Sequence, residues 1–431
     1  MVTRFSRRDF LKTSTAAGFW IAGRQLGYGQ EKSPNAKLNV ASIGVGGRGR
    51  ASIDGCRNET IVALCDVDRR QMDKTAKVYP GAKIFTDFRK MLETEKSIDA
   101  VTVGTPDHIH APASVMAMKL GKHVYCEKPL AHSIHEVRLM AETAAKMKVV
   151  TQMGNQLHST ENVIAPAELL RAGVVGTVKE VHSWSDKAFA PGDRPKDTPP
   201  VPEALDWDLW LGPAPERPYH PSYVPFHWRG WWDFGTANLG DMACHILDPI
   251  VWGLELGAVA TAEAEGPAPH PESGPPWRIV RYEFLARPGQ PPVKLTWTDG
   301  GKRPPAELHP GVTLPGQGSL VVGEKGTMLL IHGNSFKLLG ALASEPPPAV
   351  KKFKRPANYD HHGDWIEAIK TGGQAGSHFA YASLLTEIPH VGNLAYRAGK
   401  RIEWDSASLK AKNCPEADRF IRREYRKGWT L

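Results

Sequence analysis

A glycine-rich turn between an apolar strand and a helix constrains this fold more than any other feature of the sequence. Gly44, Gly46 and Gly49 follow the strand expected over residues 38–43 and precede the helix expected over 48–56. Gly44 allows a tight turn, Gly46 lets a phosphate group approach the backbone, and Gly49 permits close packing of the helix. The amino end of that helix also favours negative charge. This context predicts a dinucleotide-binding βαβ unit rather than an ordinary turn.

The strand expected next, over residues 61–65, ends at Asp66. This residue stands about twenty positions beyond the turn, where a carboxylate can accept hydrogen bonds from the hydroxyls of an adenosine ribose. The same carboxylate would repel the extra phosphate of NADP. We therefore expect NAD rather than NADP as the cofactor, with Gly47 and Arg48 of the turn also among the residues that bind it.

Alternation of apolar strands with amphipathic helices continues to about residue 155. Further strands are expected over 100–103, 123–126 and 149–152, with helices over 110–120 and 133–147. Apolar strands that alternate with helices predict a parallel, doubly wound sheet, because helices then cover both faces of the sheet. Residues 37–155 are therefore expected to form a Rossmann domain, and the fold class is α/β.

After residue 155 the pattern changes, and residues 156–431 are expected to form a second α/β domain. A long strand over 177–187 is followed by alternating stretches at 258–264, 279–285, 293–298, 318–322, 327–331 and 336–339. Such alternation is typical of a large open, mostly antiparallel sheet. Helices are expected over 161–172, 239–252, 362–371 and 379–398, and the proline-rich residues 345–356 are expected to be a linker.

The amino terminus resembles a twin-arginine export signal. Residues 6–12 read Ser-Arg-Arg-Asp-Phe-Leu-Lys, and the apolar stretch 16–23 that follows is too short to span a bilayer. Residues 1–30 are therefore expected to direct the protein to the twin-arginine export machinery and the periplasm, or to anchor it at the membrane if they stay uncleaved. Nicotinamide dinucleotides are cytoplasmic, so an exported protein is expected to be loaded before export and to hold its cofactor tightly.

Charge and cysteine content exclude several classes of protein. The net charge of +8 includes five basic residues and one acid within the first thirty residues, which leaves the rest of the chain at about +4. This excess is small and forms no basic run, so nucleic acid is not an expected partner. The five cysteines show no metal-type spacing and are expected to be buried small hydrophobic residues rather than disulfides or metal ligands.

Lys128 follows the strand expected over 123–126, in the sequence Cys-Glu-Lys-Pro. The carboxyl end of a parallel strand lies at the mouth of the sheet, where ligands bind. A lysine at this place can polarise or protonate a carbonyl oxygen next to a hydride acceptor. The alternative is a surface lysine on a loop.

Asp241 and His245 are four residues apart within an expected helix and therefore share one of its faces. A neighbouring carboxylate can orient an imidazole and favour its protonated form, which suits general acid–base chemistry near neutral pH. The alternative is a helix cap at Asp241 with a core histidine at His245. A metal pair is not expected, because no third ligand is evident.

Together these motifs resemble those of the Gfo/Idh/MocA oxidoreductase family, which includes glucose–fructose oxidoreductase and inositol dehydrogenase. The resemblance extends from about Leu38 to Trp404 and rests on residues 44–49, 104–110, 127–129, 241–245 and 392–397. It implies an N-terminal Rossmann domain and a C-terminal α/β domain. It also implies an open sheet that often mediates oligomerisation, so a homodimer or homotetramer is expected.

The resemblance also implies roles for individual residues. It puts Lys128 beside the substrate hydroxyl and the nicotinamide, and makes His245 the acid–base group with Asp241 as its partner or as a substrate ligand. It puts Glu127 on the nicotinamide ribose. Three residues of the 104–110 segment would line the cofactor cleft, namely Thr105, Pro106 and His108.

Aromatic residues suggest the nature of the substrate. The chain has 13 tryptophans, and residues 226–234 place three of them just before the helix that carries Asp241. Flat aromatic faces can stack on sugar rings, while charged side chains bind sugar hydroxyls. The alternative is a tryptophan-rich packing layer. The candidate substrate-binding residues are His158, Lys187, Trp228, Arg229 and Asp233.

The sequence thus predicts an exported NAD-dependent oxidoreductase that acts on a CH–OH group of a sugar, polyol or sugar derivative. A second hypothesis is a redox-neutral glycosidase that oxidises the sugar, eliminates the aglycone and restores the hydroxyl, without the usual pair of carboxylates. A third is a non-catalytic sugar-binding protein that retains an unused cofactor site.

Overall fold

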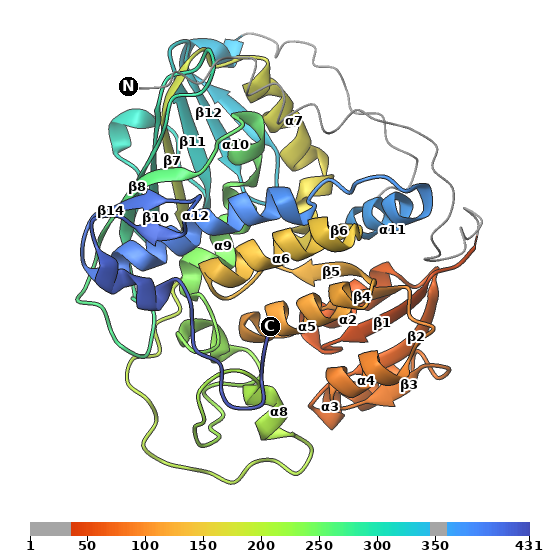
Figure 1. The fold of residues 1–431 in the computed structure, drawn as a ribbon. Helices are drawn as coiled ribbons and strands as arrows, with labels where there is room; N and C mark the ends of the chain where they lie inside the picture. Colours follow the sequence, from red (N-terminus) through yellow and green to blue (C-terminus); the bar gives the residue numbers. More distant parts are fainter. Residues whose placement is uncertain (1–35, 345–359) are drawn as a thin grey trace, which may run out of the picture. The chain divides into compact units, whose positions relative to one another are not determined.

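Two β-sheets, one of six strands and one of nine, organise the part of the chain that the structure describes (Figure 1). The structure is a computed structural model, and it describes residues 36–344 and 360–431 of the 431-residue chain. The predicted export segment, 1–30, and the predicted linker, 345–356, lie outside the described residues. None of the described helices combines the length and the apolar composition needed to cross a bilayer.

The first sheet is wholly parallel, with the strand order β3-β2-β1-β4-β5-β6. This is the doubly wound order, and it confirms the predicted Rossmann domain. Its strands are β1 (Asn39–Ile43), β2 (Thr60–Cys65), β3 (Lys83–Phe85), β4 (Ala100–Val103), β5 (His123–Glu127) and β6 (Thr151–Gly154). Its helices are α2 (Gly47–Gly55), α3 (Arg69–Ala76), α4 (Phe88–Thr94), α5 (Asp107–Lys119) and α6 (Ile134–Met147).

The second sheet has the order β13-β12-β11-β7-β10-β9-β8-β14-β15, and only its β7–β10 pair is parallel. The predicted open, mostly antiparallel sheet is therefore confirmed. Its first strands are β7 (Val178–Ser185), β8 (Val259–Glu265), β9 (Ile279–Phe284) and β10 (Val293–Asp299). The others are β11 (Gln317–Gly323), β12 (Thr327–Ile331), β13 (Phe336–Leu339), β14 (Ile402–Asp405) and β15 (Lys410–Ala411).

The single helix predicted over 239–252 is two helices in the structure, α9 (Ala237–Ile246) and α10 (Asp248–Gly253). Pro249 explains the break, because a proline has no N–H and its ring would collide with the carbonyl group four residues earlier. Within the first turn of α10 the same proline is tolerated. The remaining helices are α7 (Glu161–Arg171), α8 (Trp207–Leu211), α11 (His361–Thr371) and α12 (Phe379–Ala398).

Helices α6 and α12 lie between the two sheets and join them (Figure 1). Helix α12 packs on α6 and β6 of the Rossmann domain, and on α9 and β8 of the second domain. One hydrophobic core runs through both domains, and residues Lys37–Leu431 form one compact unit. All five cysteines are buried and free, as the sequence predicts. This common core fixes α9 relative to the carboxyl end of β5, and so positions the site described next.

Candidate active site

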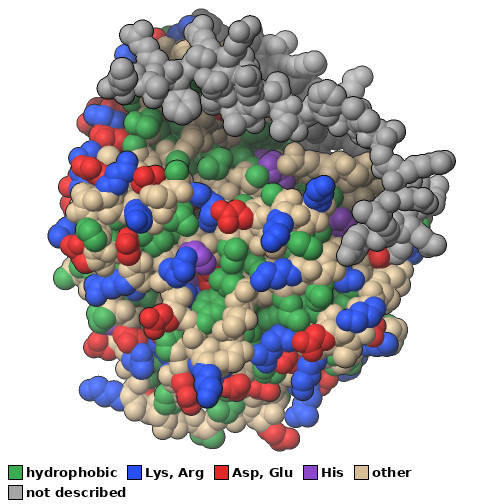
Figure 2. Space-filling view, in the orientation of Figure 1, with side chains coloured by type: hydrophobic (Ala, Val, Ile, Leu, Met, Phe, Trp, Pro, Cys, Tyr) green, Lys and Arg blue, Asp and Glu red, His purple; other side chains and the backbone are tan. Residues whose placement is uncertain are grey.

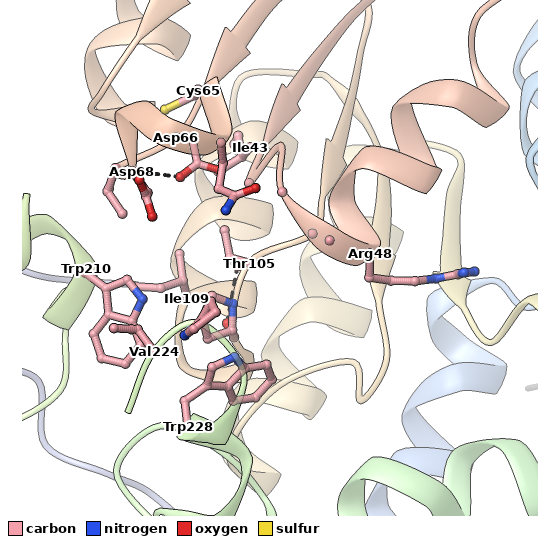
Figure 3. A pocket seen from close by; sticks show the side chains of 18 of the residues that line it. Ile43, Arg48, Cys65, Asp66, Asp68, Thr105, Ile109, Trp210, Val224 and Trp228 are labelled. Atoms are coloured by element: carbon pink, nitrogen blue, oxygen red, sulfur yellow. Dashed lines mark hydrogen bonds between the residues drawn. The ribbon is translucent and has the colours of Figure 1, made fainter. Parts of the chain in front are cut away.

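A cleft of about 710 Å³ opens at the carboxyl ends of the Rossmann strands (Figure 3). All of the predicted cofactor-binding residues line it except Gly49 and His108. Figure 3 shows Asp66 and Trp228 on opposite sides of this cleft, with Thr105 between them. The predicted cofactor residues that line it are Gly44, Gly46, Gly47, Arg48, Asp66, Thr105, Pro106, Glu127 and Lys128.

The glycine turn has the shape that a pyrophosphate requires. Gly44 has φ +80, and a Cβ there would lie 2.8 Å from the backbone of Gly104. Gly47 has φ +49 and open space around it. Gly49 does not reach the cleft, but a Cβ there would collide with the carbonyl oxygen of Gly44, so it allows α2 to pack against the turn. The backbone therefore fits a dinucleotide phosphate at the start of α2.

Asp66 presents its carboxylate to the cleft from the end of β2. Its oxygens accept hydrogen bonds from the backbone N–H groups of Val45 and Asp68, both at 2.8 Å. Burial raises the pKa of Asp66 to about 6, although these amides oppose the shift. The nearby Arg70 pairs with Asp68 at 2.7 Å rather than with Asp66. Within residues 36–344 and 360–431, no lysine or arginine forms an ion pair with Asp66, at the place where a ribose phosphate would need a cation.

Glu127 is buried at the end of β5, beside the turn. Its carboxylate accepts hydrogen bonds from Ser52 Oγ at 2.8 Å and from Gln156 Nε2 at 2.9 Å. Arg48 Nε lies 3.4 Å away. Burial raises the pKa of Glu127, while Arg48 and these hydrogen bonds lower it. The carboxylate is thus fixed in the cleft and can accept from a ligand hydroxyl.

Lys128 and Asp241 meet across the domain boundary. Lys128 Nζ donates to Asp241 Oδ1 at 2.6 Å and to the Asp241 carbonyl oxygen at 2.9 Å. Arg229 Nε lies 3.3 Å from the same Oδ1. Burial alone would raise the pKa of Asp241, but the charges of Lys128 and Arg229 lower it to about 2. An ionised Asp241 therefore holds the Lys128 ammonium at the edge of the cofactor cleft.

His245 differs from expectation in its charge and in its partner. Asp241 makes its contacts with Lys128 and Arg229, not with this imidazole. Among the described residues, His245 Nδ1 is buried and has no hydrogen-bond partner. Burial lowers the pKa of His245 well below its ordinary value, and the Lys128 charge lowers it further. The imidazole is therefore neutral, and the imidazolium expected from the sequence is not formed.

The structure places three predicted site residues away from the cleft, where each of them contacts a buried partner. The His108 ring nitrogens lie 3.3 and 2.9 Å from the carbonyl oxygens of Phe234 and Trp210, so it joins the domains. His158 is 2.9 Å from the Asp248 carboxylate and has only 2% of its surface exposed. Asp233 forms an ion pair with the buried Arg217. The predictions that these residues line the cofactor cleft or bind substrate are therefore corrected.

The other predicted substrate residues lie at or beside the site. Trp228 lines the cleft, and the Arg229 guanidinium stacks 4.2 Å from its ring centre. Lys187 reaches α9, with its Nζ 3.3 Å from Met242 Sδ. Trp228 also belongs to a packing cluster with Trp210 and Trp231, and Trp210 lines the cleft as well. The tryptophans of this region thus form a packing layer that borders the cleft in part, and stacking of Trp228 on a sugar stays a prediction.

Asp107 is a residue of the site that the sequence did not single out. It lines the cleft at the start of α5, and its Oδ2 accepts from Thr236 Oγ at 2.9 Å. Burial raises its pKa to about 7, although the charges of Lys128 and Arg229 oppose the shift. Its place directly after β4, where ligands bind in such sheets, is the signal that could have identified it.

A strap formed by residues 202–211 covers the Asp66 end of the cleft. Arg69 N donates to the Ala204 carbonyl oxygen at 2.8 Å, and the strap's Asp206 N donates to the Val67 carbonyl oxygen at 2.9 Å. Trp429, near the carboxyl terminus, also lines the cleft and lies under the Arg89 guanidinium, 4.3 Å from its carbon. The sequence carries no signal for this contact, because nothing local links Trp429 to the Rossmann domain.

No group of three or more potential metal ligands occurs within the described ranges.

Two family models match the chain one after the other. The model described as "Oxidoreductase family, NAD-binding Rossmann fold" matches residues 38–155. The model described as "Oxidoreductase family, C-terminal alpha/beta domain" matches residues 153–287. Together they cover more than half of the chain.

Individual proteins are similar over shorter segments. A glycosyl hydrolase family 109 protein of Solibacter usitatus is 32% identical over 193 residues, which are 40% of this chain and 43% of that protein. An inositol 2-dehydrogenase of Rubrobacter xylanophilus is 26% identical over 162 residues, which are 36% of this chain and 46% of that protein. The chain thus spans less than half the length of these two relatives.

Solved structures share the whole fold. The WlbA dehydrogenase of Bordetella pertussis, in complex with NADH and UDP-GlcNAcA, superposes with a TM-score of 0.60 at 15% identity. The match covers 86% of this chain and 99% of that chain. Matched in sequence by both domain models and in architecture by this structure, the chain belongs to the Gfo/Idh/MocA family of oxidoreductases.

Proposed function

We propose that this chain is a NAD-dependent oxidoreductase that acts on a CH–OH group of a sugar, polyol or sugar derivative. The observation that carries the proposal is the 2.6 Å contact of Lys128 with Asp241, at the edge of the cleft that holds the glycine turn. The names of the relatives support the substrate class, since they include an inositol dehydrogenase and a dehydrogenase bound to a nucleotide sugar.

The chain's own residues provide binding and proton transfer. When bound, the nicotinamide ring supplies a hydride acceptor or donor. Lys128 donates a hydrogen bond to the reacting oxygen, and Asp241 holds the ammonium in place. The neutral His245 has one unprotonated ring nitrogen, so it can accept the proton that leaves the substrate hydroxyl. Trp228 and Arg229 cover the cleft and exclude water from it.

We infer that the cofactor is NAD and that it stays bound between turnovers. Asp66 lacks a cation partner and would repel a ribose phosphate, which supports NAD over NADP. The strap and Trp429 enclose the same end of the cleft, which supports slow release. The measurement is competitive binding of NAD and NADP to wild type and to Asp66→Ser. The variant should lose most of the preference for NAD, and an unchanged preference would contradict this role of Asp66.

Redox-neutral glycoside cleavage is the second candidate, because a glycosyl hydrolase family 109 protein is among the relatives. In that reaction a transient ketone acidifies the adjacent C–H bond, and elimination then releases the aglycone. Addition of water and reduction of the ketone restore the sugar, so the cofactor undergoes no net change. Lys128 and His245 would serve the same proton transfers in both reactions.

One experiment separates these candidates. The purified protein, without added cofactor, is mixed with a panel of sugars and aryl glycosides while the absorbance band of reduced nicotinamide is followed. A stoichiometric change of this band without cleavage, with an oxidised sugar identified by mass spectrometry, supports the oxidoreductase. Aglycone release over many turnovers with a constant band supports the glycosidase. Sugar binding with neither change would instead indicate a binding protein.

We further propose that residues 1–30 export the folded protein through the twin-arginine machinery to the periplasm. The proposal rests on the paired arginines Arg7 and Arg8 ahead of an apolar stretch. Replacing both with lysine should retain the protein in the cytoplasmic fraction, whereas wild type should be found in the periplasmic or membrane fraction. Equal distribution of the two proteins would contradict export by this route.

A further inference from the structure

Positive charge exceeds negative charge where the cleft meets the second domain. The Lys128 ammonium and the Arg229 guanidinium both approach one oxygen, Asp241 Oδ1, at 2.6 and 3.3 Å. Asp107 and Glu127 are further carboxyl groups near Lys128, and Glu127 also has Arg48 beside it. Burial raises the pKa of Asp107 to about 7, so at neutral pH it carries only part of a negative charge. Lys128 and Arg229 therefore share the full charge of Asp241 and a partial charge on Asp107.

Lys187 brings a third cation to the same place from the end of β7. Its Nζ lies 3.3 Å from the sulfur of Met242, the residue that follows Asp241 on α9. A thioether is a weak, neutral acceptor and leaves most of the ammonium's hydrogen-bonding capacity unused. The acid next to Lys187 in the sequence, Asp186, forms an ion pair with Arg303. Within 36–344 and 360–431, Lys187 has no carboxylate at ion-pair distance.

The wall beside Lys187 adds no negative charge. The His245 and His332 rings lie with their centres 5.6 Å apart. Burial, and then the charges of Lys187 and Lys128, lower the pKa of His332 to about 4. Both lysines therefore face the same neutral ring. Its nitrogens, like those of His245, can donate or accept one hydrogen bond with a bound group.

We infer that the substrate is an anionic sugar whose carboxylate or phosphate group binds Lys187 beside Met242 and His332. This inference rests on the proposed function. Lys187 is an exposed residue, so a neutral sugar would leave its ammonium hydrated, with the thioether of Met242 as its protein contact. A negatively charged substituent would give it a charge-assisted hydrogen bond and balance the surplus of cations. The sugar ring would then lie toward Lys128 and Asp241, on the cofactor side.

Binding of matched sugars tests this inference independently of turnover. The cofactor-loaded protein is titrated calorimetrically with glucose, glucuronate and glucose 6-phosphate. We expect wild type to bind at least one anionic sugar about tenfold more tightly than glucose, the effect of one charge-assisted hydrogen bond. The anion that gains more identifies the substituent as carboxylate or phosphate. Lys187→Met should remove the preference without weakening glucose binding, and Lys187→Arg should restore part of it.

Lys179→Met is the matched control, because Lys179 is an exposed lysine of the same strand that pairs with Glu324 away from the site. It should bind all three sugars as wild type does. Equal or weaker binding of both anionic sugars by wild type overturns the inference, as does a preference that Lys187→Met retains. The nicotinamide absorbance is recorded in the same samples. A constant band combined with a preference that depends on Lys187 would count against net oxidation of these sugars while supporting the anionic ligand.

Discussion

At the scale of single residues, the Lys128 ammonium is the group whose removal tests the proposed chemistry most directly. Lys128→Met keeps the apolar stem, and Asp241 retains Arg229 as a partner, so the fold should survive. We expect turnover to fall at least about 100-fold, the usual contribution of a positioned proton donor or acceptor. The cofactor content of the purified protein should stay close to that of wild type.

Steady-state rates measure the turnover, and the absorbance of bound cofactor measures the cofactor content of the same samples. Lys179→Met, which removes an equivalent charge far from the cleft, should leave both unchanged. A Lys128→Met protein with about half of the wild-type turnover would show that Lys128 only supports the structure.

The raised pKa of Asp107 should make the folded protein less stable as the pH rises. Lys128, Arg229 and Asp241 face it, and burial raises its pKa from 3.8 to about 7 in the folded state. Between these two values the folded protein holds a proton that the unfolded chain has released. The folded state therefore loses stability as the pH rises through this window.

Asp107→Asn should abolish this loss. The melting temperature of the variant minus that of wild type should increase from about pH 4 to about pH 7 and then level off. Thermal unfolding at several pH values measures the difference. The exposed Asp73, replaced in the same way, serves as the control and should show a difference independent of pH. A flat difference for Asp107→Asn would mean that its carboxyl group is already ionised in the folded protein.

Single residues also show where sequence reasoning fails. Gly44, Gly46 and Asp66 could be assigned to the cleft because their places follow from local strand and helix boundaries, whereas the family resemblance implied the place of Glu127. The sequence could not show that His158 and Asp233 are engaged elsewhere. His158 contacts the carboxylate of Asp248, and Asp233 forms an ion pair with Arg217. The charge of His245 was missed for the same reason, because Lys128 occupies the carboxylate that was assigned to it.

At the scale of elements, the strap and the carboxyl-terminal segment form the least expected part of the cleft. Trp429 packs on Phe88 with ring centres 5.9 Å apart and is largely buried. Removing this ring should open the Asp66 end. Truncating a buried aromatic side chain costs about 2 kcal/mol or more, so we expect Trp429→Ala to release cofactor at least about tenfold faster.

The nicotinamide content that remains after extended dialysis measures this release. Trp429→Phe should retain more cofactor than Trp429→Ala, because an aromatic ring still closes the cleft. Leu285→Ala, at an exposed position that does not line the cleft, should behave as wild type. Equal retention by all of these proteins would show that Trp429 does not limit release.

Most elements could be predicted from the sequence, and the exceptions have physical causes. Strands with a continuous apolar run, such as β4 and β5, begin where expected. The short β3 was missed because it has only three residues, Lys-Ile-Phe, which are mostly exposed. The division of 239–252 into α9 and α10 was missed because the apolar pattern continues across Pro249, although the backbone cannot.

At the scale of the whole molecule, the site exists only because both domains share one core. Lys128 and Asp241 are 113 residues apart and come from β5 and α9. Local patterns identify each of them but not their contact, which depends on α12 packing against both domains. On the face drawn in Figure 2, basic and acidic side chains are interspersed rather than gathered by sign.

We propose that any association of subunits through the outer face of the nine-stranded sheet depends on the charges of that face. Its exposed positions on β9 and β10 are charged, with Arg281 and Glu283 beside Lys294. Arg281 pairs with Glu265 at 3.1 Å, and Glu283 with Arg401 at 3.2 Å. The family resemblance implies a homodimer or homotetramer through such a sheet. An interface on this face would be held by ion pairs rather than by an apolar core, and salt would weaken it.

We therefore expect the mass measured by light scattering to fall toward that of one chain as salt rises from about 50 mM to about 1 M, where the screening length shrinks to roughly 3 Å. Arg281→Glu should produce the same dissociation at low salt, because it reverses one charge within the face. Arg57→Glu makes the same change at an exposed turn of the Rossmann domain and should leave the mass unchanged. A mass that is insensitive both to salt and to Arg281→Glu would mean that the subunits associate through another surface, or that the protein is a monomer whose charged sheet face is simply solvated.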